Sequence, residues 1–110
     1  MFPPPIPSVD PEGVSADAVV LDVREPDEWQ AGHIEGAVHI PLSQLPTRAE
    51  ELSPDDEIVV VCRSGGRSSR AAGWLSQNGF DVLNLDGGMV AWAASGQKMV
   101  SETGEAPTVR

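Results

Sequence analysis

Short apolar runs along this chain alternate with segments whose apolar residues recur at helical spacing. The run 58–61 consists only of β-branched residues, which is typical of a strand buried on both faces. Four further runs predict strands, at 6–9, 18–23, 37–40 and 80–85. Because the strands alternate with helical segments, we predict an α/β fold, a sandwich with a mainly parallel sheet.

The segments between the strands predict four helices, at 26–31, 43–52, 68–77 and 89–94. We expect 43–52 to form one amphipathic helix, because Leu45 and Leu52 share a face with the other apolar residues of the segment. Ser68 or Ser69 is the expected N-cap of the third helix, since a serine hydroxyl can accept a hydrogen bond from a free amide of the first turn.

The length of 110 residues suits one domain with one core. Residues 1–10 hold four prolines in the first seven positions and predict an extended lead-in. Residues 11–98 form the predicted domain. Residues 99–110 form a polar tail, which we expect to fray.

A formal net charge of -10 disfavours nucleic acid or an acidic membrane surface as a partner. The first residues contain no basic residue and no apolar run of signal-peptide length, and no stretch is apolar enough to span a membrane. A single cysteine cannot form an internal disulfide, so the fold needs no oxidising compartment. We therefore expect a cytoplasmic protein.

That single cysteine, Cys62, follows the central strand directly and precedes a glycine pair, Gly65 and Gly66. A strand, a short glycine loop and a helix start together form a cradle of backbone N–H groups. Such a cradle stabilises an anion, and the nearest candidate anion is the thiolate of Cys62.

Positive charge gathers at the same place. Of seven lysine and arginine residues, Arg63, Arg67 and Arg70 lie within eight positions of Cys62. Arginines beside a thiol favour its ionised form. The loop therefore predicts a reactive cysteine rather than an inert buried one.

Four pieces of the sequence, in this order, resemble the rhodanese domain: LDVREPDEW, GHIEGAVHIP, VVVCRSGGRSSRAAGWL and GFDVLNLDGGMVAW. The resemblance covers about residues 11–98. It implies a three-layer sandwich, in which helices flank a five-stranded parallel sheet, and a persulfide carried on Cys62.

The length of the loop separates two chemistries within this resemblance. Rhodanese-like sulfurtransferases resemble Cys-x-x-Gly-x-Arg at this point, a pattern that Cys62, Gly65 and Arg67 match with four residues between cysteine and arginine. Phosphatases of related fold have one more residue there, which widens the cradle for a tetrahedral phosphate. The shorter loop favours sulfur transfer.

The loop supplies the expected site residues. Cys62 is the nucleophile, Arg67 orients the sulfonate of a donor and holds the loop, and Arg63 is a solvent-facing contact. Ser68 either donates a hydrogen bond to the persulfide or only caps the helix. The full expected substrate-binding set is Arg63, Ser64, Gly65, Gly66, Arg67 and Ser68.

Four residues outside the loop are expected to give structural support. The resemblance implies an ion-pair network close to the loop for Asp22, Arg24 and Glu25. His33 is expected to fix a turn through a hydrogen bond. With His39 as the second of only two histidines, we expect no metal site, and the proposed chemistry needs no cofactor.

These observations favour a single-domain thiosulfate sulfurtransferase whose partners are small sulfur donors and thiol acceptors. Two alternatives stay open. One is a carrier module that relays persulfide sulfur from a cysteine desulfurase to a partner protein. The other, which the short loop disfavours, is a phosphatase or an arsenate reductase.

Overall fold

The computed structural model describes residues 5–110 and contains one five-stranded sheet. The strands lie in the order β1-β5-β4-β2-β3, and every pairing is parallel. Their bounds are Ser8–Val9 for β1, Val19–Asp22 for β2, Val38–His39 for β3, Glu57–Val61 for β4 and Asp81–Leu85 for β5. The predicted α/β fold with its parallel sheet is confirmed, and β4, which leads to Cys62, is the central strand.

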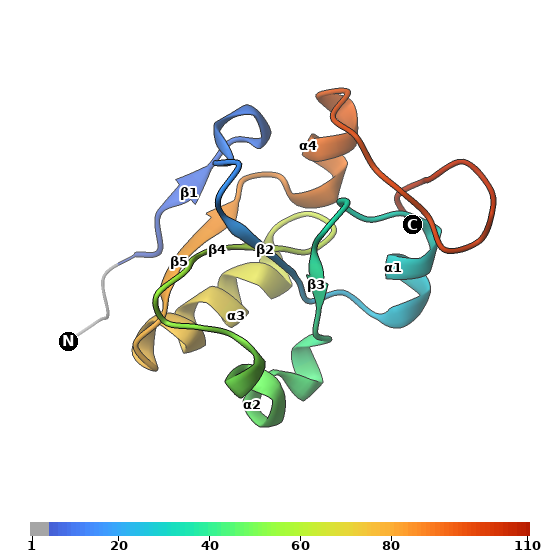
Figure 1. The fold of residues 1–110 in the computed structure, drawn as a ribbon. Coiled ribbons are helices and arrows are strands. Elements are labelled where there is room, and N and C mark those ends of the chain that lie inside the picture. Colours follow the sequence, from blue (N-terminus) through green and yellow to red (C-terminus); the bar gives the residue numbers. More distant parts are fainter. Residues whose placement is uncertain (1–4) are drawn as a thin grey trace.

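Within the described residues, three helices lie between successive strands: α1 (Pro26–Ala31), α2 (Leu45–Arg48) and α3 (Gly66–Gln77). A fourth helix, α4 (Gly88–Ala94), follows β5. Three 3₁₀ turns, Pro11–Gly13, Leu42–Gln44 and Ala49–Glu51, complete the regular structure. α2 and α3 cover one face of the sheet, and α4 covers the other (Figure 1). Among the helices of residues 5–110, none has the length and apolar content of a membrane-spanning segment.

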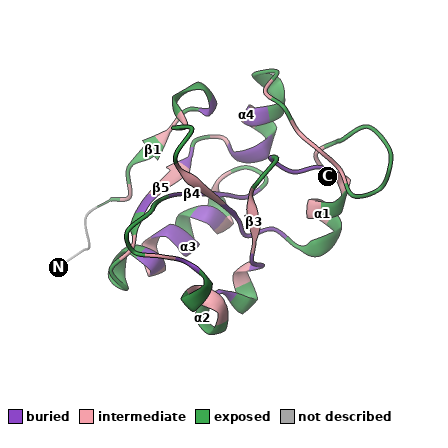
Figure 2. Cartoon of the chain, in the orientation of Figure 1, coloured by how far each residue is buried: buried purple, intermediate pink, exposed green. Residues whose placement is uncertain are grey.

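Side chains of β4 alternate between two cores, as the period of a strand requires. Ile58 and Val60 pack under α3, while Val59 and Val61 pack on the side of α4. Cys62 continues this alternation and belongs to the α3 core. Figure 2 shows that α3 is buried along one side and exposed along the other. The thiol therefore lies between the carboxyl end of β4 and the N-terminus of α3.

The amphipathic helix expected at 43–52 is not continuous. Its place is taken by a 3₁₀ turn, the single turn α2 and a second 3₁₀ turn. Pro46 lies in the first turn of α2 and has no amide hydrogen for a preceding turn of helix. The apolar face is nevertheless correct, since Leu45 and Leu52 are buried in the core.

The polar tail was expected to fray, but it packs on the rest of the domain. The amide of Thr108 donates to the carbonyl of Ala31 at 2.9 Å, and His33 and Val100 form an antiparallel bridge. Met99 packs on the α4 core. Backbone hydrogen bonds thus hold the segment beside the end of α1, and isolated apolar residues pack it on the α4 core. Neither kind of contact gives a periodic signal in the sequence. The domain bounds stay a prediction, and residues 1–4 of the lead-in lie outside the described part of the chain.

A buried ion pair fixes the end of β2. Asp22 and Arg24 are both fully buried, and two guanidinium nitrogens, Nε and Nη2, donate to the carboxylate at 2.7–3.1 Å. The Nη2 of Arg24 also donates to the carbonyl of Gly32 at 2.8 Å, at the end of α1. The pair therefore joins the strand to the helix that follows it.

Replacing one partner of this pair should be costly. We predict that Asp22→Asn lowers the free energy of unfolding by about 3–5 kcal/mol, because the Arg24 charge would remain buried without its counter-charge. Glu51→Gln is the matched control: it breaks the exposed pair between Arg48 and Glu51 and should leave the unfolding midpoint almost unchanged. Urea denaturation measures both. An equally small effect of the two variants would contradict the role given to the buried pair.

Candidate active site

The loop between β4 and α3 turns sharply at Gly65. Its φ of 120° lies in a region that residues with a Cβ rarely adopt, and Gly65 is the N-cap of α3. The helix starts at Gly66, so the expectation of Ser68 or Ser69 as the N-cap is wrong. Ser68 instead lies inside the first turn and is fully buried. The glycines begin the helix early enough to bring its first amides next to Cys62.

The sulfur of Cys62 lies inside this turn. The amide of Gly65 donates to Sγ at 3.1 Å, and the hydroxyl of Ser68 lies 3.4 Å from Sγ. Burial raises the pKa of the Cys62 thiol, but the Ser68 hydroxyl and the amides of Ser68, Gly65 and Ser64 together bring that pKa below its ordinary value. The loop is thus arranged to stabilise a negative charge on sulfur.

The N-terminus of α4 determines which way the loop amides point. Met89 donates its amide to the carbonyl of Cys62 at 2.9 Å, and Val90 donates to the carbonyl of Arg63 at 3.1 Å. With these carbonyls directed to α4, the amides that follow are free to face the sulfur. Gly88 allows this approach: a Cβ there would lie 2.5 Å from the Cys62 carbonyl oxygen.

Arg67 does not stand free to meet a substrate. Its two terminal nitrogens bind both carboxylate oxygens of Glu28, on α1, at 2.7 and 2.8 Å. Hydrogen bonding to Arg67 lowers the pKa of Glu28 from 4.5 to about 2, and the same carboxylate raises the pKa of Arg67. This bidentate pair clamps the first turn of α3 to α1, a contact that the sequence reading missed.

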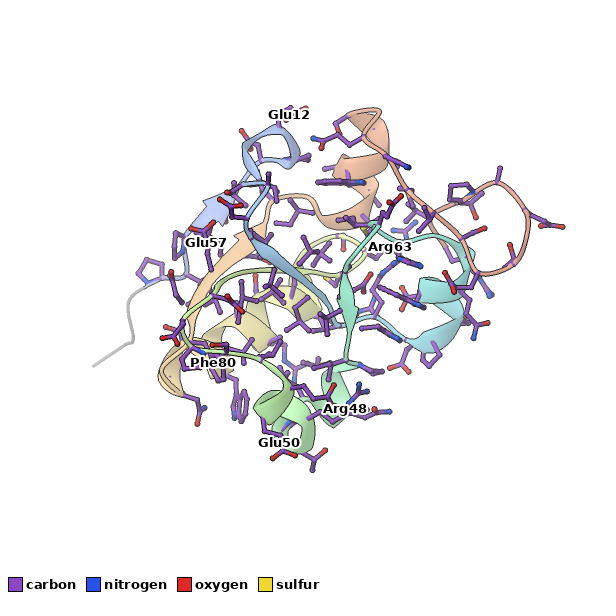
Figure 3. All side chains as sticks on the ribbon, in the orientation of Figure 1. Glu12, Arg48, Glu50, Glu57, Arg63 and Phe80 are labelled. Atoms are coloured by element: carbon purple, nitrogen blue, oxygen red, sulfur yellow. The ribbon has the colours of Figure 1, made fainter. Side chains whose placement is uncertain are left out.

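Arg63 and Ser64 form the outer side of the loop. Both are exposed, and the Nε of Arg63 donates to the carbonyl of Arg110 at 3.0 Å. Figure 3 labels Arg63, whose side chain lies towards the C-terminal segment. Ser64 contributes its amide to the surroundings of the sulfur. Arg110 therefore lies beside the outer side of the loop.

Of the three residues expected in an ion-pair network, Asp22 and Arg24 pair with each other, whereas Glu25 has a different role. Glu25 forms a capping box with Glu28 at the start of α1. His33 bonds to the carbonyl of Ile34 at 3.0 Å and to Glu102 at 2.9 Å, and its ring stacks on Trp29 with centroids 3.5 Å apart. Within residues 5–110, no three histidine, cysteine, aspartate or glutamate side chains gather as a metal site would require.

Residues 12–95 match the family described as Rhodanese-like domain. The chain belongs to this family.

Relatives of this rhodanese-like domain carry names from sulfur chemistry. A protein of Allochromatium vinosum named sulfurtransferase is 40% identical over 89 residues, covering 80% of this chain and 83% of that protein. YrkF of Bacillus subtilis, provisionally named a sulfur carrier protein, is 47% identical over 74 residues, covering 66% of this chain and 40% of YrkF. The family and these relatives support sulfur transfer as the general chemistry.

The fold agrees with this membership. The crystal structure of a rhodanese-related protein from Thermoplasma volcanium has a TM-score of 0.82 and 33% sequence identity, and the match covers 86% of this chain and 97% of that one. The five-stranded parallel sheet with flanking helices is therefore the rhodanese fold, as the resemblance implied.

Gly88 offers a test of the rhodanese loop. We predict that Gly88→Ala lowers the free energy of unfolding by about 3 kcal/mol or more, because the new Cβ meets the carbonyls of Cys62 and Arg63 in addition to straining φ. Gly79→Ala is the control: its φ is also positive, but a Cβ there meets nothing within 4 Å. It should cost only about 1–2 kcal/mol. Equal losses, measured by thermal or urea unfolding, would contradict the contact with α4.

The Glu28–Arg67 pair should make stability depend on pH. Because the pKa of Glu28 is lowered in the folded protein, its contribution is complete above about pH 4.5 and is lost as the pH falls towards about 2. We predict that Glu28→Gln costs about 1–2 kcal/mol near neutral pH, a reduced figure because Arg67 is partly exposed.

Urea denaturation of both proteins, from about neutral pH down to about pH 3, measures this difference. The two free energies of unfolding should converge as the pH falls. A difference that stays constant over that range would show that the ionised carboxylate of Glu28 is not what stabilises the fold.

Proposed function

We propose that this protein moves a sulfane sulfur from thiosulfate, or a similar donor, to a thiol or cyanide through a persulfide on Cys62. The main support for this proposal is the position of the Cys62 sulfur. Sγ accepts a hydrogen bond from the amide of Gly65 and lies beside the amides of Ser64 and Ser68. A ring of amide dipoles fixed before the reaction stabilises an anionic sulfur without reorganising.

In the first half of the reaction, the Cys62 thiolate attacks the outer sulfur of thiosulfate. A new S–S bond forms to Sγ, while the bond between the outer sulfur and the sulfonate sulfur breaks and its electron pair leaves with sulfite. The outer sulfur retains a negative charge. The loop amides that stabilise the thiolate then stabilise the persulfide anion, and no general base is required.

In the second half, a thiolate or cyanide attacks the outer sulfur of the persulfide. A bond forms between the acceptor and that sulfur, and the S–S bond to Cys62 breaks with its electrons returning to Sγ. The thiolate is regenerated, so the cycle closes without a cofactor. With cyanide as the acceptor, the product is thiocyanate.

In this proposal, the donor approaches the sulfur from the outer side of the loop. Only 1% of Cys62 is exposed, whereas Arg63, Ser64 and Gly66 on the outer side of the loop are exposed. Because Arg67 is bound to Glu28, we assign to it the holding of the loop. We assign the approach of the anionic donor to Arg63 instead.

The similarity to YrkF favours a second reading, in which the protein is a carrier that receives sulfur and hands it to a partner protein. Both readings use the same persulfide. They differ in turnover: an enzyme forms thiocyanate repeatedly from thiosulfate and cyanide, whereas a carrier needs its partner for repeated cycles. A phosphatase or arsenate reductase is disfavoured by the four residues between Cys62 and Arg67.

Intact-protein mass spectrometry tests the proposal. After treatment with thiosulfate, the wild-type mass should rise by one sulfur atom, and cyanide should reverse the gain. Cys62→Ser should show no gain, because a serine hydroxyl is a far weaker nucleophile than a thiolate.

A wild-type mass that does not change, or a serine variant that still gains sulfur, would contradict the persulfide on Cys62. Hydrolysis of an aryl phosphate by the wild type, without turnover of thiosulfate, would favour the phosphatase.

A further inference from the structure

The hydroxyl of Ser68 has one hydrogen and three neighbouring acceptors. Its Oγ lies 3.4 Å from Sγ of Cys62, 3.2 Å from the carbonyl oxygen of Gly65 and 2.6 Å from Oδ1 of Asn84. A hydroxyl donates to one acceptor at full strength. By distance, the hydrogen belongs to Asn84, which lies on β5.

The amide of Asn84 is oriented so that its oxygen faces Ser68. Its Nδ2 donates to Oγ of Ser69 at 3.0 Å, which leaves Oδ1 for the hydroxyl of Ser68. The backbone of Asn84 pairs in register with Val60, two residues before the cysteine. Since Ser68 is fully buried, water does not replace any of these partners.

We propose that Asn84 is a positioning residue that competes with the sulfur of Cys62 for the single hydroxyl hydrogen of Ser68, and so limits how readily the thiolate forms. Neither the family nor the loop pattern assigned this side chain to the site. The inference deepens the proposed function, because it rests on the use of Cys62 as a nucleophile.

Two hydrogen-bonding states follow from the geometry. In the thiol state, the S–H of Cys62 donates to Oγ of Ser68, and the hydroxyl donates to Asn84. In the thiolate state, the sulfur has no hydrogen, and the hydroxyl of Ser68 must turn to it to stabilise the charge. Asn84 then loses the hydrogen bond that it accepted. Loss of this bond opposes ionisation, so removal of the Asn84 acceptor should favour the thiolate.

The charged groups around the thiol are the same in the wild type and in the Asn84→Ala protein. Arg67 on α3 acts on the sulfur by its charge and is paired with Glu28 on α1. Asp22, the last residue of β2, is paired with Arg24. β5 contributes the neutral Asn84 to the hydrogen-bond chain, so its replacement by alanine changes no charge.

The experiment measures the pKa of the Cys62 thiol from the pH dependence of its alkylation by iodoacetamide. Asn84→Ala should lower that pKa by about half a unit to one unit, the scale of one hydrogen bond. Asn84→Asp should raise it, because a carboxylate accepts the hydroxyl hydrogen more strongly and repels the thiolate. Asn78→Ala, which removes an exposed asparagine bonded to the Trp74 carbonyl, is the control and should leave it unchanged.

A double variant separates competition through Ser68 from other effects. In a Ser68→Ala background there is no hydroxyl hydrogen to share, so adding Asn84→Ala should produce no further shift. An Asn84→Ala protein whose thiol pKa rises or stays the same would overturn the proposal. So would an equal shift in the Ser68→Ala background. Thermal unfolding confirms that each variant is folded before its thiol is titrated.

This test is independent of sulfur transfer. Alkylation reports on the thiol alone, so a failure of the proposed function would appear as a missing persulfide with the pKa order of the variants intact. A failure of the Asn84 proposal would appear as a wrong pKa order in a protein that still forms the persulfide.

Discussion

The amides after β4 can face the Cys62 sulfur because the carbonyls of Cys62 and Arg63 bond to the first turn of α4. The contact requires a helix start without a side chain at Gly88. It also requires that α3 begin at once, which Gly65 and Gly66 allow. The reactive loop is therefore held between two helix N-termini, one that binds its carbonyls and one that supplies amides to the sulfur. The Glu28–Arg67 pair and the hydrogen bond between Ser68 and Asn84 are additional contacts around this loop.

The proposed function requires an acidic protein to stabilise a thiolate and to admit an anionic donor. The loop contains arginines, yet Arg67 is neutralised by Glu28 and acts as a clamp. The dipoles of the loop amides supply the local stabilisation of sulfur, because they keep their direction whatever the charge of the surface. Arg63 is exposed at the outer edge of the loop, which is the side from which we propose that the donor approaches.

The sequence predicted well what depends on local pattern. The β-branched run of β4, the glycines after Cys62 and the alternation of strands with helices led to the correct fold and to the loop that surrounds the thiol. The prediction of one continuous helix at 43–52 was wrong because Pro46 interrupts the helix. The expectation that residues 99–110 fray was wrong because isolated residues, such as Met99, make the contacts of this segment. Isolated residues give no periodic signal in the sequence.

Contacts between distant residues could not be predicted in the same way. Glu28 reads locally as an acidic residue in the first turn of α1, and nothing in its neighbourhood points to Arg67. Asn84 reads as an ordinary strand position until the parallel register places it beside the first turn of α3. Gly88 did give a signal, the Gly87–Gly88 pair after β5, but its backbone partner became visible only in the fold. These three residues position the site, and only the structure brings them together.

In the proposed function, the loop amides stabilise an extra sulfur carried on Cys62. Amide NMR spectra of the thiol and persulfide forms test it most directly, because a stronger hydrogen bond shifts an amide proton downfield. We expect downfield shifts for the amide protons of Ser64, Gly65 and Ser68 in the persulfide form, and almost no shift for the amide proton of Met89. Unchanged resonances for the three loop amides in a protein that carries the persulfide would contradict it.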